Sequence, residues 1–169
     1  YYDLLTKMSA YPPSSVVVTG EPRYDILAVA DRVFSREKFC SKLNLDLGKK
    51  IVLVAPEGEA FLRNILRALK NFPDLQIVVK PHPREKGERY NKVVKEENVR
   101  AIILSRKAET FEVLYACDLL IAGFSTVITE ATILGKPCVT VHLGEREDPT
   151  PYYKEVSLRV YREENLVPA

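Results

Sequence analysis

Short runs of Val, Ile and Leu alternate along this chain with stretches whose apolar residues recur at helical spacing. The apolar runs are predicted strands, at 14–20, 49–57, 75–83, 99–105, 118–122, 137–143 and 156–161. Helices are predicted between them, at 35–45, 59–72, 84–98, 109–117 and 125–135. Strands that are almost continuously apolar are buried on both faces, which is typical of parallel sheets covered by helices.

Regular alternation of strand and helix predicts crossover connections and therefore a doubly wound parallel sheet. We expect an α/β fold in three layers, with helices on both faces of a Rossmann-like sheet. Ligands of such sheets bind beyond the carboxyl ends of the strands. The residues that follow each strand are therefore the ones in which a function is to be sought.

The 169 residues are enough for one good core, and no repeat or low-complexity segment divides them. We predict one domain over 16–169, preceded over 1–15 by an interdomain linker or the remnant of a helix. The chain opens on Tyr1 rather than methionine and stops at ENLVPA, which reads like the start of another helix. These ends suggest a fragment of a longer, two-domain protein.

Composition narrows the class of protein. The net charge of +2, from 25 basic and 23 acidic residues, gives no reason to expect nucleic acid as a partner. No apolar run is long enough to span a bilayer, and no secretory signal opens the chain; peripheral membrane contact stays open for the whole protein. Cys117 and Cys138 lie in apolar settings, which indicates buried free thiols in a reducing, cytoplasmic compartment. With 2 histidines and scattered cysteines, no metal or cofactor is predicted.

The sequence GFST at 123–126 joins a predicted strand to a predicted helix. Gly123 lets the backbone turn sharply and lie close to a ligand. Ser125 or Thr126 can cap the helix, whose free N–H groups and dipole would form a site for an anion. Glu130 lies one turn further on the side of Thr126, where its carboxylate can accept hydrogen bonds from two ribose hydroxyls. The alternative is a serine that only caps and a glutamate that only favours the dipole, but the combination favours a nucleotide diphosphate.

Two other strand ends carry polar residues. His82 in KPHP is held between prolines and can donate to a phosphate oxygen or a sugar hydroxyl, or it satisfies a local backbone turn. Lys80 of the same motif belongs to the strand and is interpreted as a strand-end charge. Gly20 ends the first predicted strand, and Arg23 after it can reach a phosphate bidentately. Arg23 can equally form a weak surface pair with Asp25.

The familiar nucleotide fingerprints are missing from the sequence. GxGxxG does not follow the first strand, and neither GxxxxGK[ST] nor GxSxG occurs. The polar stretch 142–148 is interpreted as a solvated loop. Phosphate charge would therefore be met by helix N-termini and a few side chains.

Three stretches resemble the C-terminal, nucleotide-sugar-binding domain of GT-B glycosyltransferases and of their relative, UDP-N-acetylglucosamine 2-epimerase. VVVTGEPRYDIL (16–27) resembles the entry strand of that domain, with Glu21 in place of the common asparagine. ETFEVLYACDLLIAGFSTVITEATILGKPCVTV (109–141) resembles its most distinctive block: a helix ending in Ala-x-Asp, a strand, a Gly/Ser turn, a helix with Glu, then Gly-x-Pro. KPHP is similar to polysialyltransferase-like and glycerophosphate-transferase-like members.

The resemblance implies roles for particular residues. The backbone at Ser125 and Thr126 would hold the diphosphate, and Glu130 the ribose hydroxyls. The loop from Arg106 to Thr110 would lie against the base, largely through backbone groups. His82 and Gly20 would line the cleft.

The resemblance also implies a function. We expect the donor-binding half of a glycosyltransferase that transfers a sugar from a nucleotide diphosphate without a metal, the acceptor site lying on a missing N-terminal domain. The epimerase turn is usually Asp-Ser-Gly-Gly, so Phe124 at this turn and KPHP favour a transferase. The alternatives are the matching half of an epimerase and a non-catalytic nucleotide-binding domain. The isolated chain is expected to bind its nucleotide sugar and not to turn it over.

Overall fold

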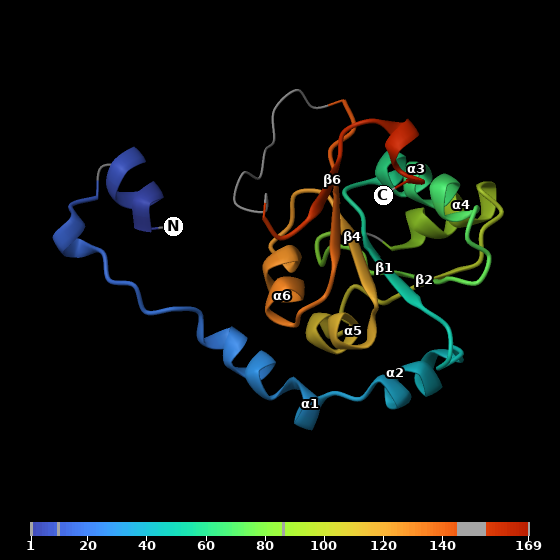
Figure 1. Cartoon of the computed structure of the whole chain (residues 1–169), viewed down its shortest axis with the longest axis horizontal. Coiled ribbons are helices and arrows are strands. Elements are labelled where there is room, and N and C mark those ends of the chain that lie inside the picture. The colour runs from blue at the N-terminus through green and yellow to red at the C-terminus, as the bar shows by residue number, and fades with distance from the viewer. Residues whose placement is uncertain (1, 10, 86, 145–154, 169) are drawn as a thin grey trace.

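The computed structural model describes residues 2–9, 11–85, 87–144 and 155–168. One parallel sheet has the strand order β3-β2-β1-β4-β5-β6 (Figure 1). The strands are β1 (Ile51–Ala55), β2 (Gln76–Val79), β3 (Ala101–Ile103), β4 (Leu119–Ala122), β5 (Cys138–Val141) and β6 (Leu158–Val160). The doubly wound α/β sheet predicted from the alternation is confirmed.

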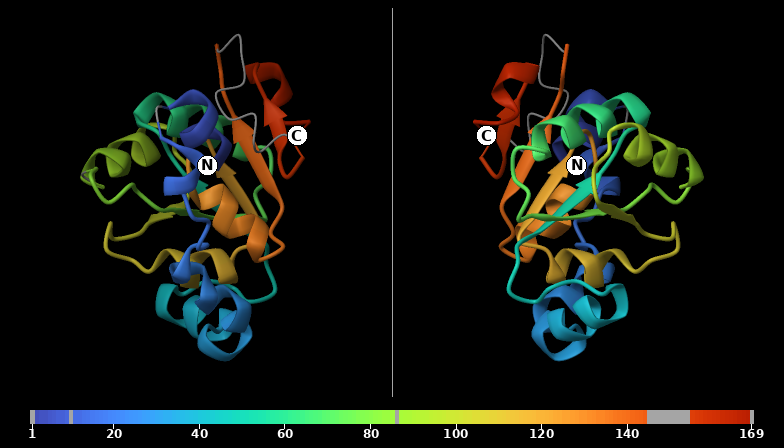
Figure 2. Two further views of the ribbon diagram at one scale, coloured as in Figure 1. Left: turned by 90° about the vertical axis from the view of Figure 1, so that its left-hand side faces the viewer. Right: turned by 90° about the vertical axis from the view of Figure 1, so that its right-hand side faces the viewer.

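Helices cover both faces of the sheet (Figure 2). They are α1 (Ala30–Val33), α2 (Arg36–Leu43), α3 (Glu59–Leu69), α4 (Glu88–Glu96), α5 (Thr110–Ala116) and α6 (Val127–Ile133). The label η marks a short π-helix at η1 (Leu4–Met8) and 3₁₀-helices at η2 (Pro13–Ser15), η3 (Pro22–Val29) and η5 (Glu163–Asn165). Side chains of α2, α5 and α6 share one core cluster, and those of α3 and α4 share another.

Strand β1 shows why the chain forms three layers. Ile51 and Leu53 point to the cluster of α2, α5 and α6, whereas Val52 and Val54 point to that of α3 and α4. All four are at most 2% exposed. Burying each such side chain stabilises the fold by about 1.5–3 kcal/mol, so a central strand must be apolar at every position.

The strand order places a switch point between β1 and β4. The chain leaves β1 toward β2 and β3 on one side, and it returns to β4 and β5 on the other. Ala55 and Ala122, the last residues of β1 and β4, are register partners. The crevice beyond them is where a sheet of this order binds its ligand.

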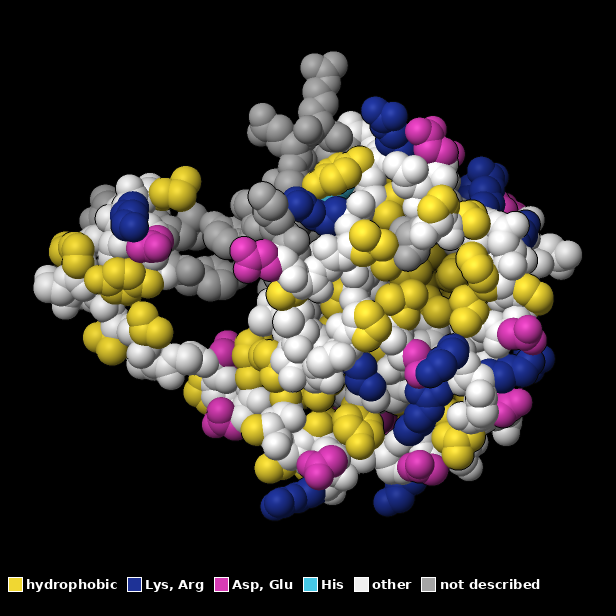
Figure 3. All heavy atoms as spheres, in the orientation of Figure 1, with side chains coloured by type: hydrophobic (Ala, Val, Ile, Leu, Met, Phe, Trp, Pro, Cys, Tyr) yellow, Lys and Arg dark blue, Asp and Glu magenta, His cyan; other side chains and the backbone are white. Residues whose placement is uncertain are grey.

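The predicted strand at 14–20 is wrong. Pro13–Ser15 forms the short turn η2, and 16–20 have no regular structure. Val17 and Val18 are 78% and 75% exposed, on a segment that extends away from the sheet (Figures 1 and 3). Strand propensity reports the fit of a side chain to a pleated, half-buried surface, and this segment has no sheet neighbour in the part of the chain that the structure describes.

Predicted helix ends are largely confirmed. Ser35 Oγ accepts a hydrogen bond from the N–H of Lys38 at 3.2 Å and so caps α2. Gly135, with φ +66°, follows the end of α6. The helix predicted over 84–98 begins only at Glu88 and ends at Glu96. Cys117 and Cys138 are buried and free, as predicted, and Cys40 is buried and free as well.

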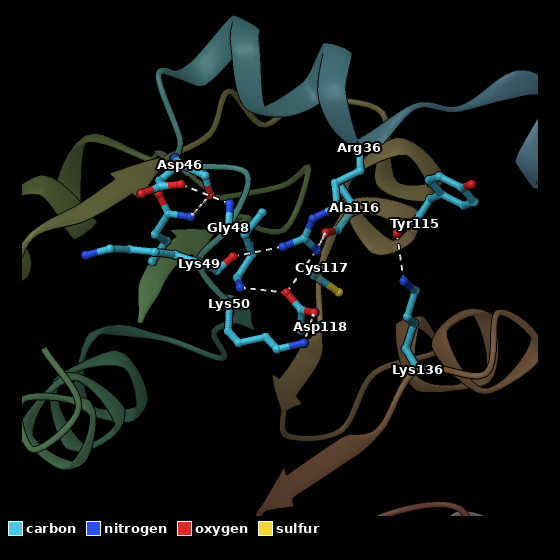
Figure 4. Close-up of polar contacts among 12 residues, drawn as sticks. Arg36, Asp46, Gly48, Lys49, Lys50, Tyr115, Ala116, Cys117, Asp118 and Lys136 are labelled. Carbon is cyan, nitrogen blue, oxygen red and sulfur yellow. Dashed lines mark hydrogen bonds and ion pairs between the residues drawn. The ribbon is translucent and has the colours of Figure 1, made fainter. Parts of the chain in front are cut away.

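Asp118 lies at the amino end of β4, at the end of the sheet opposite the switch-point crevice, and makes several polar contacts there (Figure 4). Its Oδ2 accepts from the N–H of Ile51 at 2.8 Å and lies 2.9 Å from Arg36 Nη1, while its Oδ1 lies 3.0 Å from Lys50 Nζ. Burial would raise the pKa of Asp118, but the Ile51 N–H and the two cations together lower it. The Asp of the Ala-x-Asp motif therefore joins α2, β1 and β4 and has a structural role.

Candidate functional site

A cleft of about 520 Å³ opens at the switch point, beyond the carboxyl ends of β1, β2 and β4. Five stretches far apart in sequence meet there: η3, the β1–α3 turn, the KPHP motif, the start of α5 and the β4–α6 turn. The lining residues are Arg23, Ala55, Pro56, Glu57, Lys80, Pro81, His82, Pro83, Glu85, Thr110, Phe124, Ser125, Thr126, Val127 and Glu130. The structure thus brings together six of the residues selected from the sequence.

Glu130 is the most deeply buried carboxylate of the cleft. It extends from α6, and the residue is only 3% exposed. Burial raises the pKa of Glu130, Glu109 raises it further, and the cations of Arg23 and Lys80 act in the opposite direction. A buried carboxylate is costly unless it is paired, so its place beside two cations marks it as a candidate binding group.

Arg23 is the ion-pair partner of Glu130, although 107 positions separate the two residues. The Arg23 side chain is 60% exposed, and its guanidinium lies 5.2 Å from the ring centre of Phe111 and 5.7 Å from that of Tyr24. The sequence offered a phosphate or Asp25 as partners for Arg23 and gave no signal for Glu130. An exposed guanidinium held over aromatic rings can exchange partners without losing its position.

Lys80 belongs to the site, which the interpretation as a strand-end charge missed. The residue is 7% exposed and lines the cleft from the end of β2. Its Nζ donates to the backbone oxygens of Arg106 at 3.3 Å and Pro81 at 3.5 Å, both long hydrogen bonds. Burial lowers the pKa of Lys80, against the pull of Glu109 and Glu130. The signal in the sequence was a lysine at the end of an otherwise apolar strand.

His82 forms the local turn expected from the sequence and also lines the cleft. Its Nδ1 accepts a hydrogen bond from the N–H of Arg84 at 3.1 Å, the local turn expected between the prolines. The same residue is exposed and lines the cleft. An accepting Nδ1 places the proton of the neutral ring on Nε2, which makes Nε2 a donor.

The turn between β4 and α6 uses several of its N–H groups internally. The N–H of Val127 donates to Ser125 Oγ at 3.3 Å, and the N–H of Phe124 faces the carboxylate of Glu57 and acts to lower its pKa. Ser125 thus acts as the capping side chain, while Thr126 makes no side-chain capping bond. A Cβ on Gly123 would meet the Glu57 carboxylate, so a larger residue here would force the Glu57 side chain to move.

A second cleft of about 500 Å³ adjoins the first and shares Arg23, Lys80 and Thr110 with it. The loop predicted to face a base lines it through Arg106 and Thr110. Apolar walls come from η3, the following loop and α5, namely Ile26, Phe34 and Phe111. A flat, partly apolar slot beside a charged cleft suits a planar base next to its phosphates.

Gly20 lies apart from these residues. It is exposed, has φ +80°, and lines neither cleft. The loop predicted at 142–148 falls outside the described residues from 145 onward. Within the described ranges, no group of three or more His, Cys, Asp or Glu side chains could hold a metal ion. Nor does any described helix have the length and hydropathy to cross a membrane.

The strand order, the two helical layers and the switch-point cleft define a Rossmann-like domain. Residues 3–151 match the family model described as UDP-N-acetylglucosamine 2-epimerase. The chain belongs to this family. No curated protein matches it significantly.

Solved structures of similar fold come from both branches of the superfamily. UDP-GlcNAc 2-epimerase from Neisseria meningitidis, bound to UDP-GlcNAc, matches with a TM-score of 0.68 and 18% identity over 98% of this chain and 48% of that one. A variant of the wall teichoic acid polymerase TagF, soaked with CDPG, matches with a TM-score of 0.69 and 19% identity over 99% and 43%. The ADP-heptose heptosyltransferase II of E. coli matches at 0.58 and 14% over 78% and 46%. The chain thus spans about half the length of these proteins.

Proposed function

We propose that this domain binds a nucleotide-diphosphate sugar in the two adjoining clefts at the switch point. The observation that carries the proposal is the buried carboxylate of Glu130 beside Arg23 and Lys80 at the carboxyl ends of parallel strands. Proteins of similar fold support it, because one is bound to UDP-GlcNAc and another was soaked with CDPG. Both compounds combine a ribose, a diphosphate and a polar group.

Each group of such a ligand has a complementary part of the site. The Glu130 carboxylate accepts from both ribose hydroxyls, because a carboxylate can accept two hydrogen bonds at once. Arg23 then exchanges Glu130 for the diphosphate, for which its planar fork is suited. Lys80 supplies a second positive charge, and Ser125 and Thr126 line the same cleft. The base occupies the slot lined by Arg106 and Thr110.

His82 faces the distal part of the ligand in this arrangement. Its Nε2–H is a donor in the first cleft, and His82 does not line the base slot. A donor in this place would hold a phosphate or sugar oxygen that gains negative charge as the bond to the sugar breaks. Leaving-group stabilisation of this kind needs no metal, since it comes from Arg23, Lys80 and His82.

The reaction of the whole protein depends on the N-terminal domain, which would carry the groups that act on the sugar. Family membership supports epimerisation of a UDP-linked N-acetyl sugar. Phe124 at the turn, the KPHP motif and the resemblance to transferase folds support transfer to an acceptor. Incubating the full-length protein with UDP-GlcNAc decides between them: an epimerase inverts C2 with no acceptor present, whereas a transferase releases the nucleotide only when an acceptor is added.

Binding by this domain is tested by calorimetric titration with UDP, CDP, GDP and ADP. A nucleotide present at 100 times its Kd should stabilise the fold by about 2.7 kcal/mol, which a thermal melt detects. Glu130→Gln should weaken the best nucleotide by about tenfold or more, because a hydrogen bond to a charged group contributes about 1.5–3 kcal/mol. Lys80→Met should weaken it through the loss of a buried cation.

Glu112→Gln is the matched control. Glu112 lies on α5 and pairs with Lys42 at 2.6 Å, and it lines neither cleft. Its substitution should leave nucleotide affinity unchanged. If Glu130→Gln folds and binds as tightly as the wild type, the assignment of the ribose to Glu130 is refuted. If none of the four nucleotides binds, the proposal of a nucleotide site fails, and a domain that keeps the fold without the ligand becomes the better account.

A further inference from the structure

The proposed site already holds one of the chain's own anions. Glu57 follows β1, and although the residue is exposed, its carboxylate is turned across the crevice onto Gly123 after β4. There it faces the backbone N–H of Phe124, which acts to lower the pKa of the carboxyl. A backbone N–H beyond the strand ends at the switch point is the kind of group to which a doubly wound sheet binds a phosphate.

We infer that Glu57 competes with the ligand phosphate for this N–H, so that an anion binds there only when the Glu57 carboxylate takes up a proton or moves away. The inference rests on the proposed function and adds a regulation to it: the affinity of the site for phosphate groups is coupled to protons through one residue. The exchange requires only the Glu57 side chain to move, with no change in the described backbone.

The charge balance of the cleft points to Glu57 rather than to its other carboxylates. Three carboxylates line the cleft, those of Glu57, Glu85 and Glu130. Glu130 is paired with Arg23, and Glu85 lies 3.1 Å from Arg89. Among the described residues, no lysine or arginine forms an ion pair with Glu57. Its negative charge is therefore the one that a phosphate entering the cleft would meet uncompensated.

The groups that face Glu57 come from three elements. Burial raises the pKa of Glu57, and Glu85, after β2, raises it further. The N–H of Phe124, after β4, and His142, after β5, act in the opposite direction without cancelling the rise. His142 is 5% exposed, and within the described part of the chain its Nε2 has no hydrogen-bond partner. Lys80 lines the same cleft on the side of β2, where it favours an incoming anion.

Sulfate is the appropriate probe, because its charge stays constant between pH 5 and pH 8. Its affinity is measured from the shift of the Phe124 amide signal in ¹⁵N-labelled protein. Glu57→Gln keeps the shape of the side chain and removes its charge, so sulfate should bind this variant about tenfold more tightly than the wild type at pH 7.5. Glu59→Gln is the matched control: it removes the same charge two residues away, from an exposed side chain outside the cleft. This control should bind sulfate like the wild type.

The pH dependence provides the second arm of the experiment. Lowering the pH from 7.5 to 5.0 should tighten sulfate binding to the wild type, and Glu57→Gln should remove most of that gain. The titration is repeated in His82→Gln, because His82 lines the same cleft. The gain that depends on Glu57 should persist in this variant, because the two residues act on the anion separately.

Equal sulfate affinity in Glu57→Gln and the wild type would overturn the inference, as would a Phe124 amide that sulfate does not shift in either protein. These outcomes are distinguishable from failure of the proposed function. Nucleotide binding that depends on Glu130, with no effect of Glu57→Gln on sulfate, overturns the coupling alone. Sulfate binding strengthened by Glu57→Gln, with no nucleotide bound, overturns the nucleotide assignment alone.

Discussion

Replacing Asp118 with asparagine should destabilise the domain more than any comparable loss of one surface carboxylate. Asp118 accepts from the N–H of Ile51 at 2.8 Å and pairs with Arg36 at 2.9 Å and Lys50 at 3.0 Å. Asparagine keeps the shape and one acceptor oxygen but removes the charge. The change therefore isolates the electrostatic part of the contact that joins α2, β1 and β4 (Figure 4).

The magnitude follows from the exposure of each partner. The hydrogen bond from Ile51 loses its charge assistance, which costs about 1 kcal/mol. The pair with Arg36 has both side chains 24% exposed and contributes about 1 kcal/mol. Lys50 is 73% exposed, so its pair adds little. Asp118→Asn should thus lower the free energy of unfolding by about 2 kcal/mol, a factor of about 30 in the folding equilibrium.

Urea denaturation at pH 7 measures this free energy, with Asp74→Asn as the matched control. Asp74 is 95% exposed and lies 3.6 Å from Lys49, so its loss should cost less than about 0.5 kcal/mol. Because the pKa of Asp118 is lowered in the folded state, its stabilisation is present above the unfolded pKa of about 3.9 and is lost as the pH falls through the folded value. The wild-type and Asp118→Asn stabilities should therefore converge as the pH falls below the unfolded pKa. A variant within 0.5 kcal/mol of the wild type at pH 7 would refute the reasoning.

Three further predictions concern the core and the helix ends. Burial raises the pKa of Cys117 to about 12 and that of Cys138 to about 11, so neither thiol should react with Ellman's reagent at pH 8 until the protein is unfolded. Ser35→Ala removes the cap of α2 and should cost about 1 kcal/mol in urea denaturation; no loss would show that the cap contributes nothing. Tyr90→Phe removes the hydroxyl that donates to Glu85 at 2.5 Å and should cost about 1 kcal/mol; an unchanged melting temperature would contradict this.

The sequence alone determined the layers of the fold, because a strand that is buried on both faces is apolar at almost every position. The runs at 49–57, 75–83, 99–105, 118–122 and 137–143 each contain an observed strand, and 156–161 contains the edge strand β6. The same reasoning failed at 14–20, since β-branched residues report a preference for a strand and carry no information on whether a neighbouring strand exists. A pattern local to one segment cannot supply that neighbour.

The site shows the same division. Residues at strand ends could be selected from the sequence, because parallel strands present their carboxyl ends at one edge. His82, Ser125, Thr126 and Glu130 were found in this way and do line one cleft. Arg23 pairs with Glu130, and Glu57 contacts Gly123. The partners in each contact are far apart in the sequence, so no local sequence pattern predicts either contact.

Only the tertiary structure decided which charges meet. The sequence placed Lys80 at the end of a strand. It gave no sign that the side chain is buried, with its Nζ donating to the backbone oxygens of Pro81 and Arg106. It placed Gly123 in a tight turn, but the carboxylate that lies against the glycine comes from a residue that follows the neighbouring strand. Periodicity records the environment of a residue averaged along its own element, whereas electrostatic partners are set by how separate elements pack, and that information exists only once the chain has folded.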